Sequence, residues 1–233
     1  MLLEFSCSNH KSIREKVFFS TLAGTDTTYE DKIYNFDGLR VLKSAVLYGA
    51  NGSGKSNFID AISFVKYLVT NSVSNAPGQG IGQLPHKLEG FKKESVYKIQ
   101  FVSNKVRYAY SFSIKDMIVI DEYLYYFPNG RQTKIFERSY EEFSAGSKFR
   151  GRLNTCKDVL KPNRLLLSCA VNFSSVEEVA EAYRFFDDEL VIYKPGNEDN
   201  WMNYSLYQIY KDKKIKVLIC TVVLVMPVFI SLF

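Results

Sequence analysis

The sequence predicts an α/β fold that carries an antiparallel β-subdomain, and three observations support this prediction. An apolar run at residues 44–48 is followed by a glycine-rich segment and then by a stretch with helical periodicity. Further along, four segments rich in aromatic and β-branched residues alternate with short turn sequences. The composition suits a folded core, because 46% of the 233 residues are hydrophobic and 15% are aromatic.

Three strands and a helix are predicted in the first 71 residues. Residues 3–8 and 17–22 are short apolar-rich runs joined by a polar turn, and we interpret both as strands. The polar stretch 23–37 is typical of a loop, whereas the apolar run 44–48 predicts a buried strand. Apolar residues at three- and four-residue steps predict an amphipathic helix over 57–71. These residues are Phe58, Ile59, Ile62, Val65, Leu68 and Val69.

A second group of strands follows a connector that contains glycine and proline. Short turn sequences such as Pro128-Asn129-Gly130 separate the segments, and Asn-Gly favours the positive φ angles of hairpin turns. We therefore predict an antiparallel meander. Its four strands are expected at 96–102, 106–114, 117–127 and 133–138. Further on, residues 176–186 predict a helix capped by Ser174 or Ser175.

From this pattern we expect four parts along the chain. Residues 1–71 form an N-terminal lobe with the glycine-rich segment, and residues 72–140 form the antiparallel β-subdomain. Residues 141–216 contain a basic loop and a helical segment, and residues 217–233 form an apolar tail without charged side chains. The chain of 233 residues is long enough for one good-sized domain or two small ones.

The glycine-rich segment matches the pattern G-x-x-x-x-G-K-[ST] at each fixed position. Glycines let the backbone fold tightly, so that successive N–H groups converge on a phosphate. Lys55 would then neutralise the β- and γ-phosphates, Ser56 would offer its hydroxyl to Mg²⁺, and the following helix would direct its positive end at the same oxygens. The predicted nucleotide-binding residues are Gly49, Ala50, Asn51, Gly52, Ser53, Gly54, Lys55, Ser56 and Asn57.

The surroundings of this motif favour a P-loop over chance. A predicted strand before the motif and a predicted helix after it are the context that a P-loop requires. The alternative is a glycine-rich turn with an incidental lysine. Residues 104–107 lack the aspartate of the guanine-reading N-K-x-D motif, so nothing indicates GTP.

Three segments resemble bacterial AAA-type ATP-binding proteins of the ABC/SMC-like branch, which includes OLD-like and abortive-infection ATPases. They are residues 3–12, the P-loop at 49–57 and the short run 108–110, and the resemblance extends from residue 1 to about 216. It implies a P-loop NTPase core of the ABC-ATPase-like type that binds ATP and Mg²⁺. It also implies that two ATP-bound heads sandwich the nucleotides, as a homodimer or by pairing with another ATPase head, in phage defence or DNA-associated processes.

In that family the N-terminal half supplies the P-loop and an antiparallel subdomain, while the signature motif and the Walker B carboxylates lie in the C-terminal half. We therefore expect an ATP-binding protein truncated to the N-terminal half, with ATP hydrolysis a property of the family. The alternative is a non-hydrolysing nucleotide-binding fragment, or a tail-anchored interaction module, that pairs with an intact ATPase. A P-loop phosphotransferase is a third hypothesis, although no arginine-rich lid follows the predicted helix.

Asp121 and Glu122 are candidates for a Walker B pair, because they follow four apolar residues. In that interpretation Asp121 would hold Mg²⁺ through water, and Glu122 would join Lys55 as a catalytic residue by orienting the attacking water. Against it, residues 123–126 continue the strand, whereas a catalytic carboxylate usually ends one. The resemblance also places this segment in the antiparallel subdomain.

The surplus of positive charge lies in the middle of the chain, where six basic side chains form a cluster. Such a cluster is a candidate for binding nucleic-acid phosphates. We favour a solvated loop, because Phe149 is the one aromatic residue that interrupts it. The cluster consists of Lys148, Arg150, Arg152, Lys157, Lys161 and Arg164.

We expect a cytoplasmic protein, because the first residues lack a basic stretch followed by a long apolar one. Its four widely spaced cysteines then predict free thiols packed as small apolar residues, namely Cys7, Cys156, Cys169 and Cys220.

The tail at 217–233 has three interpretations: an out-of-frame end, a buried strand or a membrane anchor. As a helix it would span roughly 25 Å, which is short of the hydrocarbon core of a bilayer. We therefore do not expect a membrane partner.

Overall fold

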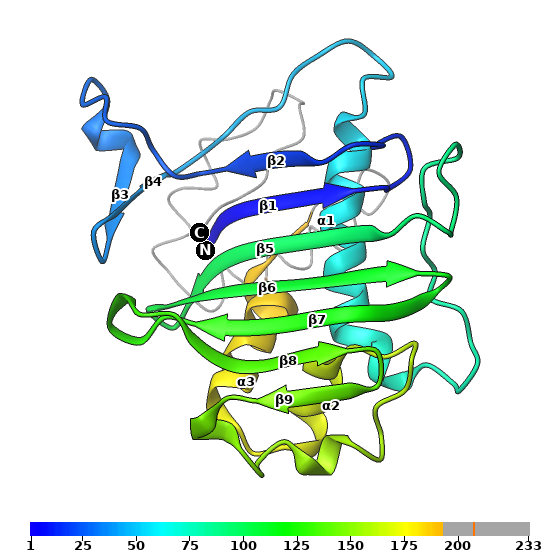
Figure 1. Ribbon diagram of the computed structural model, residues 1–233. Coiled ribbons are helices and arrows are strands. Elements are labelled where there is room, and N and C mark those ends of the chain that lie inside the picture. Colours follow the sequence, from blue (N-terminus) through cyan, green and yellow to red (C-terminus); the bar gives the residue numbers. More distant parts are fainter. Residues whose placement is uncertain (193–206, 208–233) are drawn as a thin grey trace.

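The computed structural model describes residues 1–192 and residue 207. Its main feature is a seven-stranded sheet in the order β2-β1-β5-β6-β7-β8-β9, in which each pair of neighbours is antiparallel (Figure 1). The strands are β1 (Leu2–Ser8), β2 (Val17–Ser20), β5 (Ser95–Ser103), β6 (Val106–Lys115), β7 (Ile118–Tyr126), β8 (Thr133–Ser139) and β9 (Glu142–Ala145).

The predicted meander is confirmed, and the predicted Asn-Gly turn has positive φ angles at Asn129 and Gly130. Asn104 and Lys105 link β5 to β6 with φ angles of 46° and 61°, and Asp116 and Met117 link β6 to β7 with 50° and 63°. Two consecutive residues with positive φ match the right-handed twist of the flanking strands. The meander also extends beyond the prediction, because β9 adds a further strand at its edge.

The sheet joins regions that the sequence analysis assigns to different parts of the chain. Cys7 in β1 lies opposite Tyr97 in β5, so the N-terminal strands and the meander form one sheet. Both also contribute to one hydrophobic core. The four boundaries proposed above remain a prediction.

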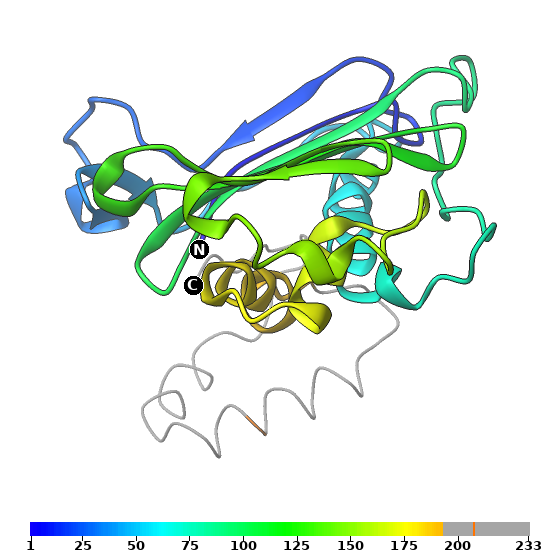
Figure 2. The same ribbon diagram turned by 60° about the horizontal axis from the view of Figure 1, so that its bottom comes forward.

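Three helices cover one face of the sheet (Figure 2). They are α1 (Lys55–Asn71), α2 (Leu166–Phe173) and α3 (Glu177–Arg184), and α3 continues into a π-helical turn at Phe185–Glu189. The helices predicted near 57–71 and 176–186 are therefore confirmed, whereas α2 escaped prediction. α1 passes behind the strands from the β2 side toward the β8 side (Figure 1).

Aromatic side chains fix α1 against the sheet. The ring of Phe58, in the first turns of α1, packs edge-on against Phe5 of β1 with 5.4 Å between ring centroids. Phe19 of β2 contacts the same ring at 5.7 Å. Such pairs contribute about 0.5–1.5 kcal/mol beyond the burial of their area, so the start of α1 is tied to these two strands.

The sequence predicts a buried strand over residues 44–48, and this prediction is wrong. The segment has no ladder partner among the described strands, and Val46 and Tyr48 are 60% and 91% exposed. An apolar run becomes a strand only where a neighbouring strand offers its backbone groups. No described strand pairs with this segment, so its composition alone does not bury it.

A second correction concerns residues 23–37, which the sequence predicts to be a loop throughout. Part of this stretch forms β3 (Ile33–Phe36), which pairs with β4 (Leu39–Leu42) in a separate two-stranded ribbon. Asp37 and Gly38 make the turn, with φ angles of 44° and 77°. Asp-Gly between two apolar-containing runs is a hairpin signal that the polar composition obscures.

The predicted cap of α3 is also wrong. The residue before α3 is Val176, and no side chain caps this helix. Ser174 instead donates its hydroxyl to the carbonyl oxygen of Ala170 at 2.6 Å, at the end of α2. Because α2 ends so close to α3, Ser174 belongs to the C-terminus of the first helix.

The predicted free thiols are confirmed for Cys7, Cys156 and Cys169, which are buried. Cys220 and the tail at 217–233 lie outside the described residues. Among the helices that the structure describes, none combines the length and the apolar character that a membrane span needs.

Candidate functional site

Residues 49–54 form a tightly curled loop that leads directly into α1. Gly52 and Gly54 have φ angles of +82° and +96°, which side chains with a Cβ rarely adopt. The Ser53 N–H donates to the carbonyl oxygen of Ala50 at 3.2 Å. A Cβ atom at Gly49 would lie 3.0 Å from the Ser53 hydroxyl oxygen. The backbone conformation of the loop therefore favours glycine at positions 52 and 54.

Lys55 folds back over this loop. Its Nζ donates to the carbonyl oxygens of Gly49 at 2.7 Å and of Ala50 at 2.8 Å, and it lies 3.5 Å from the hydroxyl oxygen of Ser53. The first helical residue thus places a positive charge within the curl of the loop. An anion bound there would meet this ammonium group and the N-terminus of α1 together.

The loop amides are available to such an anion. Within the described part of the chain, the N–H groups of Gly52, Gly54, Lys55 and Ser56 have no hydrogen-bond acceptor. A helix leaves its first N–H groups unpaired unless a side chain or a ligand accepts from them. Gly52 and Ser56 are exposed, so solvent and ligands reach this side of the loop.

These residues suit Mg·ATP. Lys55 would contact the terminal phosphates, and the exposed hydroxyl of Ser56 would ligate Mg²⁺. The unpaired amides of the loop would hold the phosphate oxygens. The side-chain amide of Asn57 donates to the hydroxyl oxygen of Ser12 at 2.6 Å.

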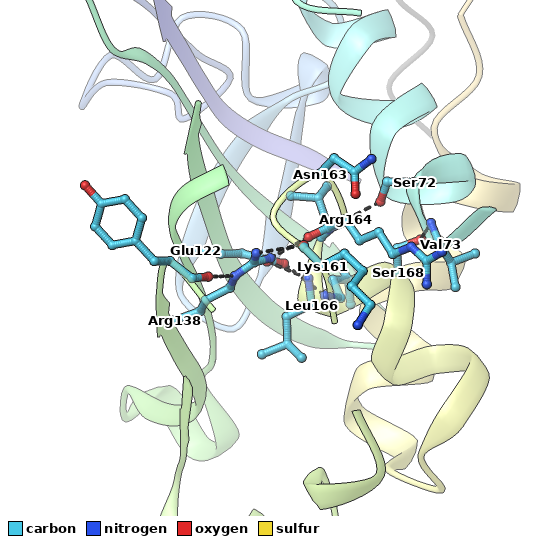
Figure 3. A network of polar contacts seen from close by, with 12 residues as sticks. Ser72, Val73, Glu122, Arg138, Lys161, Asn163, Arg164, Leu166 and Ser168 are labelled. Carbon is cyan, nitrogen blue, oxygen red and sulfur yellow. Dashed lines mark hydrogen bonds and ion pairs between the residues drawn. The ribbon is translucent and has the colours of Figure 1, made fainter. Parts of the chain in front are cut away.

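Glu122 has a different environment (Figure 3). Its carboxylate is buried and accepts hydrogen bonds from the backbone N–H groups of Leu166 and Leu167, at 2.6 and 2.9 Å. It also accepts from the hydroxyl of Tyr110 at 2.9 Å and pairs with Arg138 at 3.3 Å. Burial raises the pKa of Glu122, while Arg138 opposes this shift. The carboxylate thus joins β6, β7 and β8 to the start of α2.

The structure does not bring Asp121 and Glu122 to Lys55. Glu122 lies near the C-terminal end of α1. The residue before its two amide donors, Leu165, donates its N–H to the hydroxyl oxygen of Ser72 at 3.0 Å, and Ser72 directly follows α1. Lys55 begins this 17-residue helix, and a rise of 1.5 Å per residue separates its ends by roughly 25 Å. Asp121 lies beside Glu122 in β7 and is exposed.

Half of the basic cluster is engaged by the protein itself. Lys148 pairs with Glu178 at 2.5 Å, Arg152 donates to the carbonyl oxygen of Ser175 at 2.7 Å, and Arg164 donates to that of Asn75 at 2.7 Å. These contacts tie the basic segment to neighbouring parts of the fold. They leave fewer free cations for a nucleic-acid backbone than the sequence suggests.

Two residues near these sites, Arg138 and Ser12, have no signal in the sequence. Arg138 lies opposite Glu122 in the β7–β8 ladder, and knowledge of the register would have been needed to pair them. Ser12 belongs to a segment that the resemblance includes, but nothing in the sequence indicates its contact with Asn57, 45 residues away.

As in P-loop NTPases, a helix begins directly after the motif at 49–56, in a mixed α/β fold with a large antiparallel sheet, but the strand predicted before the motif is absent from the described residues. Comparison with known families places the chain within this class. Residues 44–216 match the family described as "AAA domain, putative AbiEii toxin, Type IV TA system", and the chain belongs to this family. It is an AAA-type family of P-loop ATPases, related to the ABC and OLD proteins, so the predicted family is confirmed. No curated protein matches the chain.

Proposed function

We propose that this protein binds Mg·ATP through residues 49–57. The observation that carries the proposal is the position of Lys55, whose Nζ lies against the carbonyl oxygens of Gly49 and Ala50 inside the loop. The N–H groups of Gly52 and Gly54 in the same loop have no hydrogen-bond acceptor among the described residues. Membership of a family of P-loop ATPases supports ATP as the nucleotide.

Each group has a defined task in this proposal. The amides and the N-terminus of α1 bind the phosphate oxygens, and Lys55 neutralises their charge. Ser56 supplies a hydroxyl ligand for Mg²⁺. The metal screens the charge between neighbouring phosphates when it is bound.

In its cellular context we propose that the chain acts as the N-terminal half of an ABC/SMC-like ATPase. Its nucleotide would be enclosed by a second ATPase head, from another copy or from an intact relative. The family description, which refers to a toxin of a type IV system, supports a role in defence against phage. Sedimentation of the chain, alone and mixed with an intact relative, would test this pairing if it is measured with and without ATP.

The substitution Lys55→Ala tests ATP binding directly. It should weaken binding by roughly 100-fold or more, because each hydrogen bond to a charged group contributes about 1.5–3 kcal/mol and Lys55 would make two. Lys98→Ala is the matched control, since Lys98 is an exposed lysine on β5. Titration calorimetry gives both affinities. Equal affinities of wild type and Lys55→Ala would refute the proposal.

A second candidate function is nucleotide binding without turnover, and the position of Glu122 favours it. This carboxylate holds α2 near the far end of α1, so it does not orient water at the loop. Under this candidate the isolated protein binds ATP but releases no phosphate in the steady state. A phosphate-release rate that disappears in Glu122→Gln, while circular dichroism shows folded protein, would instead assign Glu122 to catalysis.

A further inference from the structure

The turn between β1 and β2 contacts the nucleotide loop and α1. Ser12, in this turn, accepts a hydrogen bond at 2.6 Å from the side-chain amide of Asn57 in the first turn of α1. Its hydroxyl oxygen also lies 3.2 Å from the position that a Cβ atom on Gly54 would occupy. Ser12 therefore packs on the residue that ends the loop and bonds to the helix that follows.

A second contact lies one helical turn further along. Asp60 of α1 accepts from Lys11 Nζ at 2.7 Å and lies 3.1 Å from His10 Nε2. Asn57 and Asp60 are three residues apart, so they lie on the same face of the helix. The turn thus holds the first two turns of α1 at two points.

The turn itself has a rigid base. Asn9 is fully buried, and its side chain accepts from the His86 N–H at 2.9 Å and donates to the Lys93 carbonyl oxygen at 2.8 Å. His10 is also buried, and its Nδ1 lies 2.9 Å from the Tyr97 hydroxyl of β5. A support that is fixed in this way can hold the atoms attached to it in place.

Ser12 lies outside residues 49–57, and its side chain hydrogen-bonds to Asn57 within them. We propose that Ser12 is a positioning residue of the nucleotide site. It fixes the start of α1 relative to the sheet, so that the amides of Gly54 and Lys55 converge on the phosphates. This inference rests on the proposed function, because it concerns the binding of ATP at the same loop.

The substitution Ser12→Ala tests the inference. We expect the ATP dissociation constant to rise about 2- to 10-fold, which is the range for one lost hydrogen bond. The thermal midpoint without nucleotide should stay close to wild type, because Ser12 is exposed. Ser12→Thr should restore the affinity, since threonine retains the hydroxyl. Ser63→Ala is the control, because Ser63 bonds within α1 to the Ile59 carbonyl oxygen.

A double-mutant cycle separates positioning from general destabilisation. Asn57→Ala removes the same hydrogen bond from the helix, so the double variant with Ser12→Ala should bind ATP no more weakly than the weaker single variant. Fully additive losses of ATP affinity in the double variant would overturn the inference, and so would an unchanged affinity in Ser12→Ala. In both cases ATP binding by the wild type would still support the nucleotide site. Absence of ATP binding in the wild type would instead refute the proposed function.

Discussion

Glu122 and Arg138 form an ion pair at 3.3 Å in which neither side chain has exposed surface. Arg138 also donates to the backbone carbonyl oxygens of Tyr140, Lys161 and Arg164. Such a pair is tolerated in a core because additional hydrogen bonds satisfy both charged groups. The pair therefore organises the packing of β7, β8 and α2.

We predict that Glu122→Ala lowers the free energy of unfolding by about 3–5 kcal/mol, because it leaves the Arg138 charge buried without its partner. Urea denaturation measures this loss. Asp121→Ala is the control on the same strand, and as an exposed position it should change stability by less than about 0.5 kcal/mol. Similar losses in both variants would show that the buried ion pair has no special role.

Gly54→Ala should impair both stability and ATP binding. Its φ of +96° costs a residue with a Cβ roughly 1–2 kcal/mol, and the added methyl group would press on the Ser12 hydroxyl. Gly38→Ala is matched in backbone strain, with φ +77°, but has no atom within 4 Å of the added Cβ. Only the Gly54 variant should lose affinity in a calorimetric titration. Loss in both variants would mean that strain anywhere in the fold disturbs the site.

A different kind of glycine follows β9. A Cβ atom on Gly146 would lie 1.9 Å from the backbone carbonyl oxygen of Lys134 in β8, so the two chain segments would have to separate. Overpacking of this kind costs about 1–3 kcal/mol, and we predict a loss of at least this size in Gly146→Ala. Gly24→Ala, where the added atom meets open space, should be close to neutral. Thermal unfolding followed by circular dichroism compares the two, and equal midpoints would contradict the close approach.

The buried imidazole of His10 predicts a dependence of stability on pH. Burial lowers the pKa of His10 below its ordinary value of 6.5. The Asp60 carboxylate opposes this decrease in the pKa, and the positive charge of Lys11 adds to the decrease. The unfolded chain then binds the proton more readily than the folded one, so stability falls as the pH decreases below about 6.5. Unfolding free energies should decline less steeply over this range in His10→Gln. Parallel curves for wild type and variant would refute this contribution.

The sequence was sufficient where a feature depends on neighbouring residues. The motif at 49–56 predicts the loop because its glycines and lysine act on the backbone around them. The meander is predictable because two-residue turns such as Asn104-Lys105 join strands that follow each other. Residues 44–48 show the limit, since their apolar composition predicts burial but the partner strands that burial requires are not determined locally.

By itself the sequence determined the motif at 49–56, the helix after it and the four-stranded meander from β5 to β8, because the physical causes of these features act within a few residues. Only the tertiary structure decided which distant groups meet. It placed Ser12 beside Asn57, and it assigned Glu122 to a buried pair with Arg138 at the far end of α1 from Lys55. Hydrogen bonds and ion pairs of this kind depend on the register of strands and on the packing of helices, which no local pattern of residues specifies.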